Sequence, residues 1–197
     1  RTQVKKRLGD ELDNNFRLWF VERALHGDFS EQVTPTQTIS YIGVLQQALR
    51  DLSAWVEKDI PPPASTQYQV VDGQVLVPAG AQERRGLQPV VAVKANGVER
   101  AEVAVGESVK LLAEVALPEG AGTIVSAEWD FDGSGEYTSK VKLDGKSANP
   151  LLIKTSTQFS KPGTYFPTLR VASQRQSDGK TAYARIQNLG RVRVIVK

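Results

Sequence analysis

The feature that most constrains the fold is an alternation at residues 125–131 that runs directly into turn residues. Val125, Ala127, Trp129 and Phe131 occupy every second position, with polar or charged residues between most of them. A period of two is typical of a strand with one face on a core and the other in solvent. The next four residues read Asp-Gly-Ser-Gly, types that tolerate turn geometry and end a strand. The stretch therefore predicts a β-protein with Trp129 in its core.

Further strands are expected on both sides of this one. Pro162 and Gly163 suit the two central positions of a type II turn, and a strand carrying Tyr165, Leu169 and Val171 on one face follows. Shorter alternations recur with turn signals about every ten residues, which predicts a β-sandwich. They lie at residues 91–95, 103–105, 109–117 and 191–196. Residues 138–157 fit no strand and are interpreted as a long excursion between strands.

Two of these motifs together resemble a known family. A Trp-Asp-Phe strand that ends in an Asp/Gly loop, followed by Pro-Gly-Thr-Tyr at residues 162–165, resembles the PKD domain, an immunoglobulin-like β-sandwich. The usual loop of that family reads Gly-Asp-Gly, whereas this chain has Asp-Gly-Ser-Gly. The resemblance covers residues 88–197. It implies an all-β sandwich domain over residues 89–197 that serves in carbohydrate or protein interaction, or as a spacer.

The first 63 residues have a different pattern. Val4, Leu8 and Leu12 predict a short helix, and the aromatic-rich run at residues 16–21 predicts a strand buried on both faces. Thr34 and Gln37 form a capping box with Pro35 between them, which predicts a helix over residues 35–58. Its apolar stripe comprises Ile42, Leu45, Leu49, Leu52 and Val56, and the prolines at 61–63 stop it.

This N-terminal segment carries a second resemblance. Phe-Arg-Leu-Trp-Phe-Val at residues 16–21, Leu-His-Gly at 25–27 and Leu-Ser-Ala-Trp-Val-Glu-Lys at 52–58 are similar to the C-terminal end of an α/β-hydrolase of the tannase and feruloyl esterase type. The resemblance covers residues 1–63 and implies that a preceding hydrolase portion of a longer protein is its partner. The expected chain is α+β: residues 1–63 hydrolase-like, 64–88 a connector with a hairpin at Asp72-Gly73, and 89–197 the sandwich.

His26 is the single histidine of the chain. The hydrolase resemblance implies that it is the general base of a Ser-His-Asp triad in the longer protein. The alternative is an ordinary loop histidine. The chain contains no Gly-x-Ser-x-Gly elbow, the usual site of the nucleophile in this fold, so we expect no catalysis by this chain alone.

The loop after the tryptophan strand is a candidate calcium site. Asp130, Asp132, Ser134 and Glu136 supply oxygen atoms around a glycine turn, as in loops of the Asp-x-Asp-x-Ser-Gly kind. The twelfth position, where a bidentate glutamate belongs, is Val141, so Glu136 or Asp144 would have to replace it. The alternative is a turn whose carboxylates accept hydrogen bonds from backbone N–H groups. No other cofactor is required.

Composition narrows the class of protein. A net charge of +3 without Lys/Arg clusters interleaved with aromatics argues against a nucleic-acid partner, and no apolar run approaches the roughly 18 residues of a membrane span. The absence of cysteine excludes disulfides and zinc–thiolate sites and is compatible with a bacterial secreted or periplasmic protein.

Arginines on the expected outer face of the sandwich allow two interpretations. They could bind an anionic polysaccharide or another extracellular protein, or they could be a solvated face that prevents edge pairing. These arginines are Arg170, Arg175, Arg185, Arg191 and Arg193. Two functions therefore stay open: the C-terminal part of a secreted serine esterase with an appended sandwich, or a non-catalytic extracellular binding or adhesion module.

Overall fold

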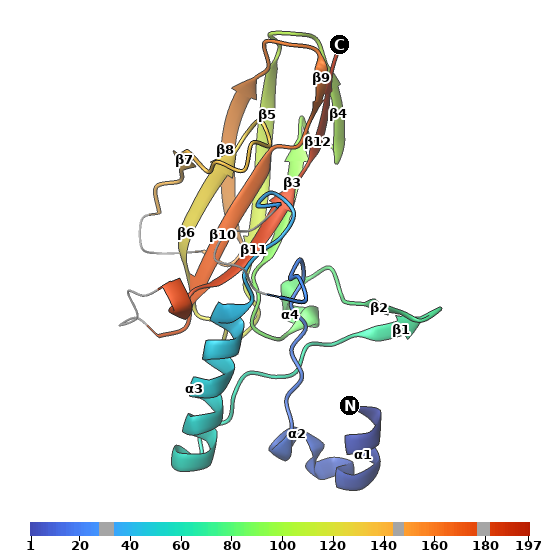
Figure 1. Cartoon of the computed structure of the whole chain (residues 1–197), viewed down its shortest axis with the longest axis vertical. Helices are drawn as coiled ribbons and strands as arrows, with labels where there is room; N and C mark the ends of the chain where they lie inside the picture. The colour runs from blue at the N-terminus through green and yellow to red at the C-terminus, as the bar shows by residue number, and fades with distance from the viewer. Residues whose placement is uncertain (28–33, 144–147, 177–181) are drawn as a thin grey trace.

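The structure is a computed structural model that describes residues 1–27, 34–143, 148–176 and 182–197 (Figure 1). Its larger part is the predicted β-sandwich, with the N-terminal elements gathered at one end of it. The strands of this part are β3 (Val90–Ala95), β4 (Arg100–Val103), β5 (Ser108–Ala116), β6 (Thr123–Asp130), β7 (Ser139–Lys140), β8 (Leu151–Gln158), β9 (Gly163–Tyr165), β10 (Thr168–Gln174), β11 (Ile186–Arg191) and β12 (Arg193–Val196). A short 3-10 turn, η2 (Ala182–Ala184), precedes β11.

Three sheets enclose one core. Their strand orders are β11-β10-β6-β7, β3-β5-β8 and β4-β12-β9, and the pairing is antiparallel except between β4 and β12. Every second residue of β5 is buried, including Val109, Leu111, Ala113 and Val115. Trp129 on β6 is 1% exposed and lies opposite Leu169 of β10. The prediction that the tryptophan strand faces the core is confirmed.

Three predictions in the second half of the sandwich are wrong. The expected single strand after Pro162 is two strands in different sheets, β9 and β10, separated by Pro167, which has no N–H to continue a ladder. Gly163, with φ 158°, already begins β9 and does not occupy a type II turn. The region expected to be an excursion contains strand β8, which pairs along β5.

The N-terminal segment begins with short helices, as expected. These are α1 (Thr2–Leu8), a 3-10 turn η1 (Gly9–Glu11) and α2 (Leu12–Asn15). Residues 16–21 are extended and half-buried but form no strand of a sheet, so the prediction of a strand buried on both faces is wrong. Instead, the Leu18 and Phe20 N–H groups donate to the hydroxyls of Ser65 (3.1 Å) and Thr66 (3.1 Å).

Helix α3 (Ile42–Lys58) begins seven residues later than the capping box predicts. Thr34 instead closes a turn, because the N–H groups of Gln37 and Thr38 both donate to its carbonyl oxygen. The orientation of α3 is unusual for an amphipathic helix. The residues of α3 buried against the rest of the molecule are Gly43, Val44, Gln47 and Asp51. The apolar stripe faces solvent, with Leu45, Leu49, Leu52 and Val56 exposed by 47%, 55%, 54% and 77%.

The connector contains the predicted hairpin, formed by β1 (Gln69–Val71) and β2 (Gln74–Leu76) around Asp72 and Gly73, both at positive φ. A short helix, α4 (Ala81–Arg84), follows within the same connector. In Figure 1 the hairpin extends away from the sandwich as an arm. Within the described ranges, no helix combines the length and apolar character that a bilayer crossing requires.

Candidate functional site: a cationic groove beside the Glu22 network

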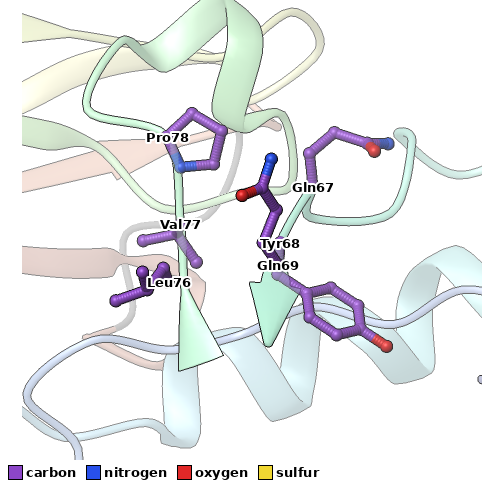
Figure 2. A pocket seen from close by; sticks show the side chains of 6 residues that line it. All are labelled: Gln67, Tyr68, Gln69, Leu76, Val77 and Pro78. Atoms are coloured by element: carbon purple, nitrogen blue, oxygen red, sulfur yellow. The ribbon is translucent and has the colours of Figure 1, made fainter. Parts of the chain in front are cut away.

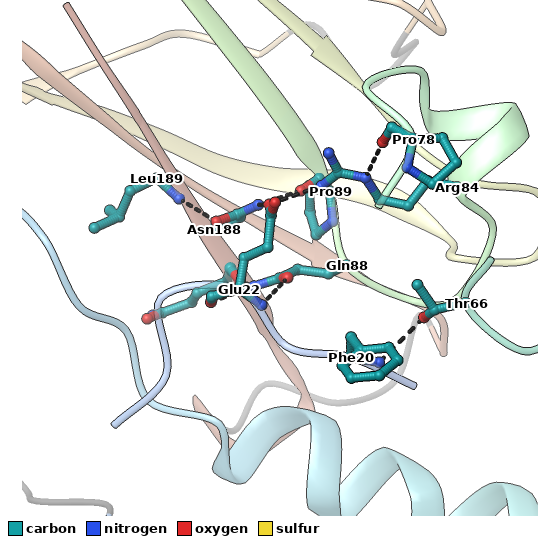
Figure 3. A network of polar contacts seen from close by, with 10 residues as sticks. Phe20, Glu22, Thr66, Pro78, Arg84, Gln88, Pro89, Asn188 and Leu189 are labelled. Carbon is teal, nitrogen blue, oxygen red and sulfur yellow. Dashed lines mark hydrogen bonds and ion pairs between the residues drawn. The ribbon is translucent and has the colours of Figure 1, made fainter. Parts of the chain in front are cut away.

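A partly buried polar network joins the N-terminal segment to the sandwich (Figure 3). The Glu22 carboxylate accepts hydrogen bonds from Arg84 (2.7 Å) and from the side-chain amide of Asn188 on β11 (3.2 Å). Its own backbone N–H donates to the Gln88 side chain (2.8 Å). Gln88 and Asn188 are buried, so each needs such partners. The network therefore holds residue 22 firmly against β11.

Arg23, the next residue, is held in an uncommon conformation. Its φ is 61°, in the left-handed region that costs energy for a residue other than glycine. The Arg23 carbonyl accepts a hydrogen bond from the Ile39 N–H (3.0 Å), within an isolated bridge between Ala24 and Ile39. Partial burial lowers the pKa of Arg23; the Glu22 carboxylate opposes that change, and the positive charge of Arg191 adds to it. The backbone thus places the positive charges of Arg23 and Arg191 close enough to repel each other.

These two arginines line a surface groove of about 390 Å³. It lies at residues of β3, β11 and β12, where β3 and β11 are the edge strands of two different sheets. Lys94 and Arg193 also line it, together with Phe166 and one carboxylate, Glu99. The guanidinium of Arg191 lies over the Phe166 ring, 5.1 Å from its centroid. The groove combines four cations and a partly apolar wall with a single acidic side chain.

His26 lies outside this groove, exposed on the loop after Ala24. Among the described residues, no hydrogen bond or ion pair to its imidazole is formed, and neither a serine nor a carboxylate is brought to it as a triad requires. Asp28, two residues on, lies outside the described residues. The catalytic role of His26 in a longer protein stays a prediction.

The carboxylates of the proposed calcium loop make hydrogen bonds to the turn itself. The two oxygens of Asp130 accept from the N–H groups of Gly133 (2.8 Å) and Gly135 (2.7 Å), and Asp132 accepts from the Ser134 N–H (3.1 Å). Burial raises the pKa of Asp130, whereas hydrogen bonding, first with Ser134 and then with Asp130, lowers the pKa of Asp132. This is the geometry of the turn-capping alternative.

The other suggested calcium ligands add little to that loop. Glu136 is exposed, its N–H donating to the Ser134 hydroxyl (3.3 Å), and Asp144 lies outside the described residues. Within the described part of the chain, no group of three or more His, Asp or Glu side chains is placed to hold a metal. The hydrogen bonds within this loop do not test calcium binding, which stays a prediction.

Three of the five arginines considered in the sequence analysis lie outside the groove. Arg170 pairs with Glu128 (2.9 Å) and lies over the ring of Tyr137, 3.9 Å from its centroid. Burial raises the pKa of Tyr137 to about 12, and its hydroxyl donates to the Pro35 carbonyl (2.8 Å). Arg175 pairs with Asp51 of α3, and Arg185 is exposed.

Only Arg191 and Arg193 of that set reach the groove. The sequence analysis missed Arg23 and Lys94 because they come from segments that only the fold brings beside β11. Lys94 alternates with buried residues on β3, which is a weak signal by itself.

A second hollow lies at the base of the hairpin (Figure 2). Gln67 and Tyr68 line it from just before β1 and Gln69 from its first position, opposite Leu76 at the end of β2 and the following Val77 and Pro78. Its volume is about 280 Å³. Tyr68 is its one titratable side chain and packs edge-on to Phe20, with ring centroids 4.9 Å apart. The hollow offers no set of groups that would bind or transform a ligand.

Comparison with known proteins adds similarity in structure but none in sequence family. The chain matches no protein-family model, and no curated protein is similar to it in sequence. Among solved structures, it is similar to the solution structure of the CARDB domain of PF1109 from Pyrococcus furiosus. The two share 12% sequence identity with a TM-score of 0.32, over 55% of this chain and 95% of that domain.

Proposed function

We propose that this chain is the closing, non-catalytic part of a secreted serine esterase of the tannase and feruloyl esterase type. In this proposal residues 1–63 complete an α/β-hydrolase domain, and residues 89–197 are an appended sandwich of the PKD kind. The observation that carries the proposal is the apolar stripe of α3, which is exposed at Leu45, Leu49, Leu52 and Val56, with Ile42 at the start of the helix half-buried. An amphipathic helix ordinarily buries such a stripe, and in an α/β-hydrolase it would do so on a sheet.

The extended segment at residues 16–22 supports the same proposal. The N–H groups of Leu18, Phe20 and Glu22 donate to side chains of residues 65, 66 and 88. Within the described residues, the alternate N–H groups, those of Arg17, Trp19 and Val21, donate to no backbone or side-chain acceptor. The N–H groups along one edge of the extended segment are thus hydrogen-bonded, and those along the other edge are available to pair with a strand. Such an edge accepts a neighbouring strand, as the last strand of a hydrolase sheet would.

The position of His26 is compatible with its proposed role. It follows the available edge and precedes the helix, in the chain order extended segment, histidine, helix. The serine, the orienting carboxylate and the oxyanion-hole donors would come from the preceding hydrolase portion. Because triad members act as a unit, the histidine without them gives almost no catalysis.

The test uses the longer reading frame of the source organism. We expect an upstream Gly-x-Ser-x-Gly elbow and a later carboxylate, and hydrolysis of aryl esters by the longer protein but not by this chain. His26→Ala in the longer protein should lower kcat by roughly four orders of magnitude or more, while Leu25→Ala, an exposed neighbour on the same loop, should leave kcat unchanged. A reading frame without an elbow, or a His26→Ala enzyme of full activity, would leave the alternative function, a non-catalytic extracellular binding or adhesion module.

A further inference from the structure

We propose that the groove between β3, β11 and β12 binds an anionic polysaccharide through carboxylate groups spaced along its chain. Its contact residues are Arg23, Lys94, Phe166, Arg191 and Arg193. Four of these residues lie in the sandwich, and Arg23 comes from residues 1–63 but belongs neither to α3 nor to the available edge at residues 17–21. The inference uses only contacts that are present in this chain. It therefore stands whether or not the chain is part of an esterase.

The four cations of this groove outnumber its one carboxylate, Glu99. Six salt bridges form among the described residues, and none includes Arg23, Lys94, Arg191 or Arg193. Arginines elsewhere on the sandwich do have acidic partners, as Arg170 has Glu128 and Arg100 has Glu102. Gathering like charges in one groove raises the free energy of the folded chain, and an anion bound there would offset that cost.

Arg23 distinguishes a binding groove from a guarded sheet edge. Lys94, Arg191 and Arg193 could serve simply to prevent edge pairing, because they lie on β3, β11 and β12. Arg23 lies on no strand, and its left-handed backbone is fixed by the Glu22 network on one side and the Ile39 hydrogen bond on the other. Protecting an edge does not require a strained residue from a distant segment. Uncommon backbone conformations of this kind cluster where side chains converge on a ligand.

The shape and chemistry of the groove favour a carboxylated glycan. Its cationic side chains are exposed along a surface groove, which suits repeating charges on a polymer. Arginine guanidinium groups bind carboxylates through two parallel hydrogen bonds. Phe166 and Val91 supply apolar surface for the faces of sugar rings. Single-stranded nucleic acid needs several aromatic platforms, and this groove has one aromatic ring, Phe166.

The test measures binding of the whole chain to polygalacturonate, with neutral dextran, heparin and single-stranded DNA in parallel. We expect binding to polygalacturonate that weakens as salt is added, and none to dextran. Arg191→Gln/Arg193→Gln should raise Kd at least about tenfold, and Arg23→Gln should raise it by several-fold. Lys5→Gln/Arg7→Gln removes the same charge from exposed positions of α1 and should leave Kd within about twofold.

Four results would count against the proposal. Equal weakening by the α1 variant would mean that net charge alone drives binding, and dextran binding would mean that the carboxylates are not recognised. Tighter binding to DNA or to heparin, lost in the groove variants, would assign the groove to a nucleic acid or to a sulfated polymer instead. An unchanged Kd for Arg23→Gln would reduce the site to an ordinary charged sheet edge. Thermal melts of the variants confirm folding, which these exposed side chains should not affect.

Discussion

Strand β5 and helix α3 carry equally regular apolar patterns, yet they use them in opposite ways. In β5 the apolar side chains face inward and the polar ones outward. In α3 the apolar stripe is exposed, and the face against the sandwich is small or polar. Gly43 permits the close approach, because a Cβ there would lie 1.9 Å from the Arg185 carbonyl oxygen.

The contact between α3 and the sandwich depends on hydrogen bonds and charge. Asp51 pairs with Arg175, which follows β10, and accepts a hydrogen bond from Gln47 (2.9 Å). Val44 adds a small apolar cluster with Leu87 and Ile186. The comparison teaches that amphipathicity predicts which face of a helix is apolar, whereas the available partners decide which face is buried. Three sets of variants test how different the two regions are.

The largest difference in the free energy of unfolding is expected when a tryptophan is replaced in each of the two regions. Trp129→Ala leaves a cavity in the sandwich core and should lower the free energy of unfolding by about 3–5 kcal/mol. Trp55→Ala on α3 removes a half-buried ring that stacks under Arg17 and should cost about 1 kcal/mol. Chemical denaturation followed by circular dichroism measures both. Equal losses would mean that α3 and the sandwich share one core.

A middle-sized effect should follow from removing the partner of a buried charge. Arg175→Met leaves the Asp51 carboxylate without its cation and should cost roughly 2 kcal/mol. The double variant Asp51→Leu/Arg175→Met should be less destabilised than the sum of the single variants, as a double-mutant cycle can measure. Arg7→Met, at an exposed position, is the control. Strict additivity would show that the pair does not hold α3 in place.

The smallest effect should come from the exposed stripe. Leu49→Ala should change the free energy of unfolding by no more than about 0.5 kcal/mol, whereas Leu111→Ala in β5 should cost about 2–5 kcal/mol. A loss above about 1.5 kcal/mol for Leu49→Ala would show that the stripe is buried in solution. Repeating the melt at several protein concentrations would then distinguish self-association from a rearranged helix.

The strands of the sandwich were the most predictable part of the molecule. Strands β3, β5 and β6 follow from alternation and from the turn residues beside them, because side chains on a strand alternate between two environments. Strand β8 was not predicted, because most of its residues after Ile153 are polar and Ile153 is its one fully buried residue. Its strand character comes from pairing with β5 over its whole length.

The start of α3 shows how a local signal can be overruled. Thr34, Pro35 and Gln37 are favourable for a helix N-terminus, but these residues form a turn. Pro35 packs beside the Gly135 loop, and its carbonyl accepts from Tyr137, contacts that a helix starting at 35 would have to share. Tertiary contacts of this kind outweigh capping, which contributes about 1 kcal/mol.

The sequence by itself determined the periodicity of each element, the position of Trp129 in a core and the set of charged residues available for a site. Only the tertiary structure decided which face of α3 is buried and which cations share a groove. The physical reason is that periodicity is a property of neighbouring residues. Burial and electrostatic coupling depend instead on segments brought together by folding, as Arg23 is brought to Arg191 by the Glu22 network.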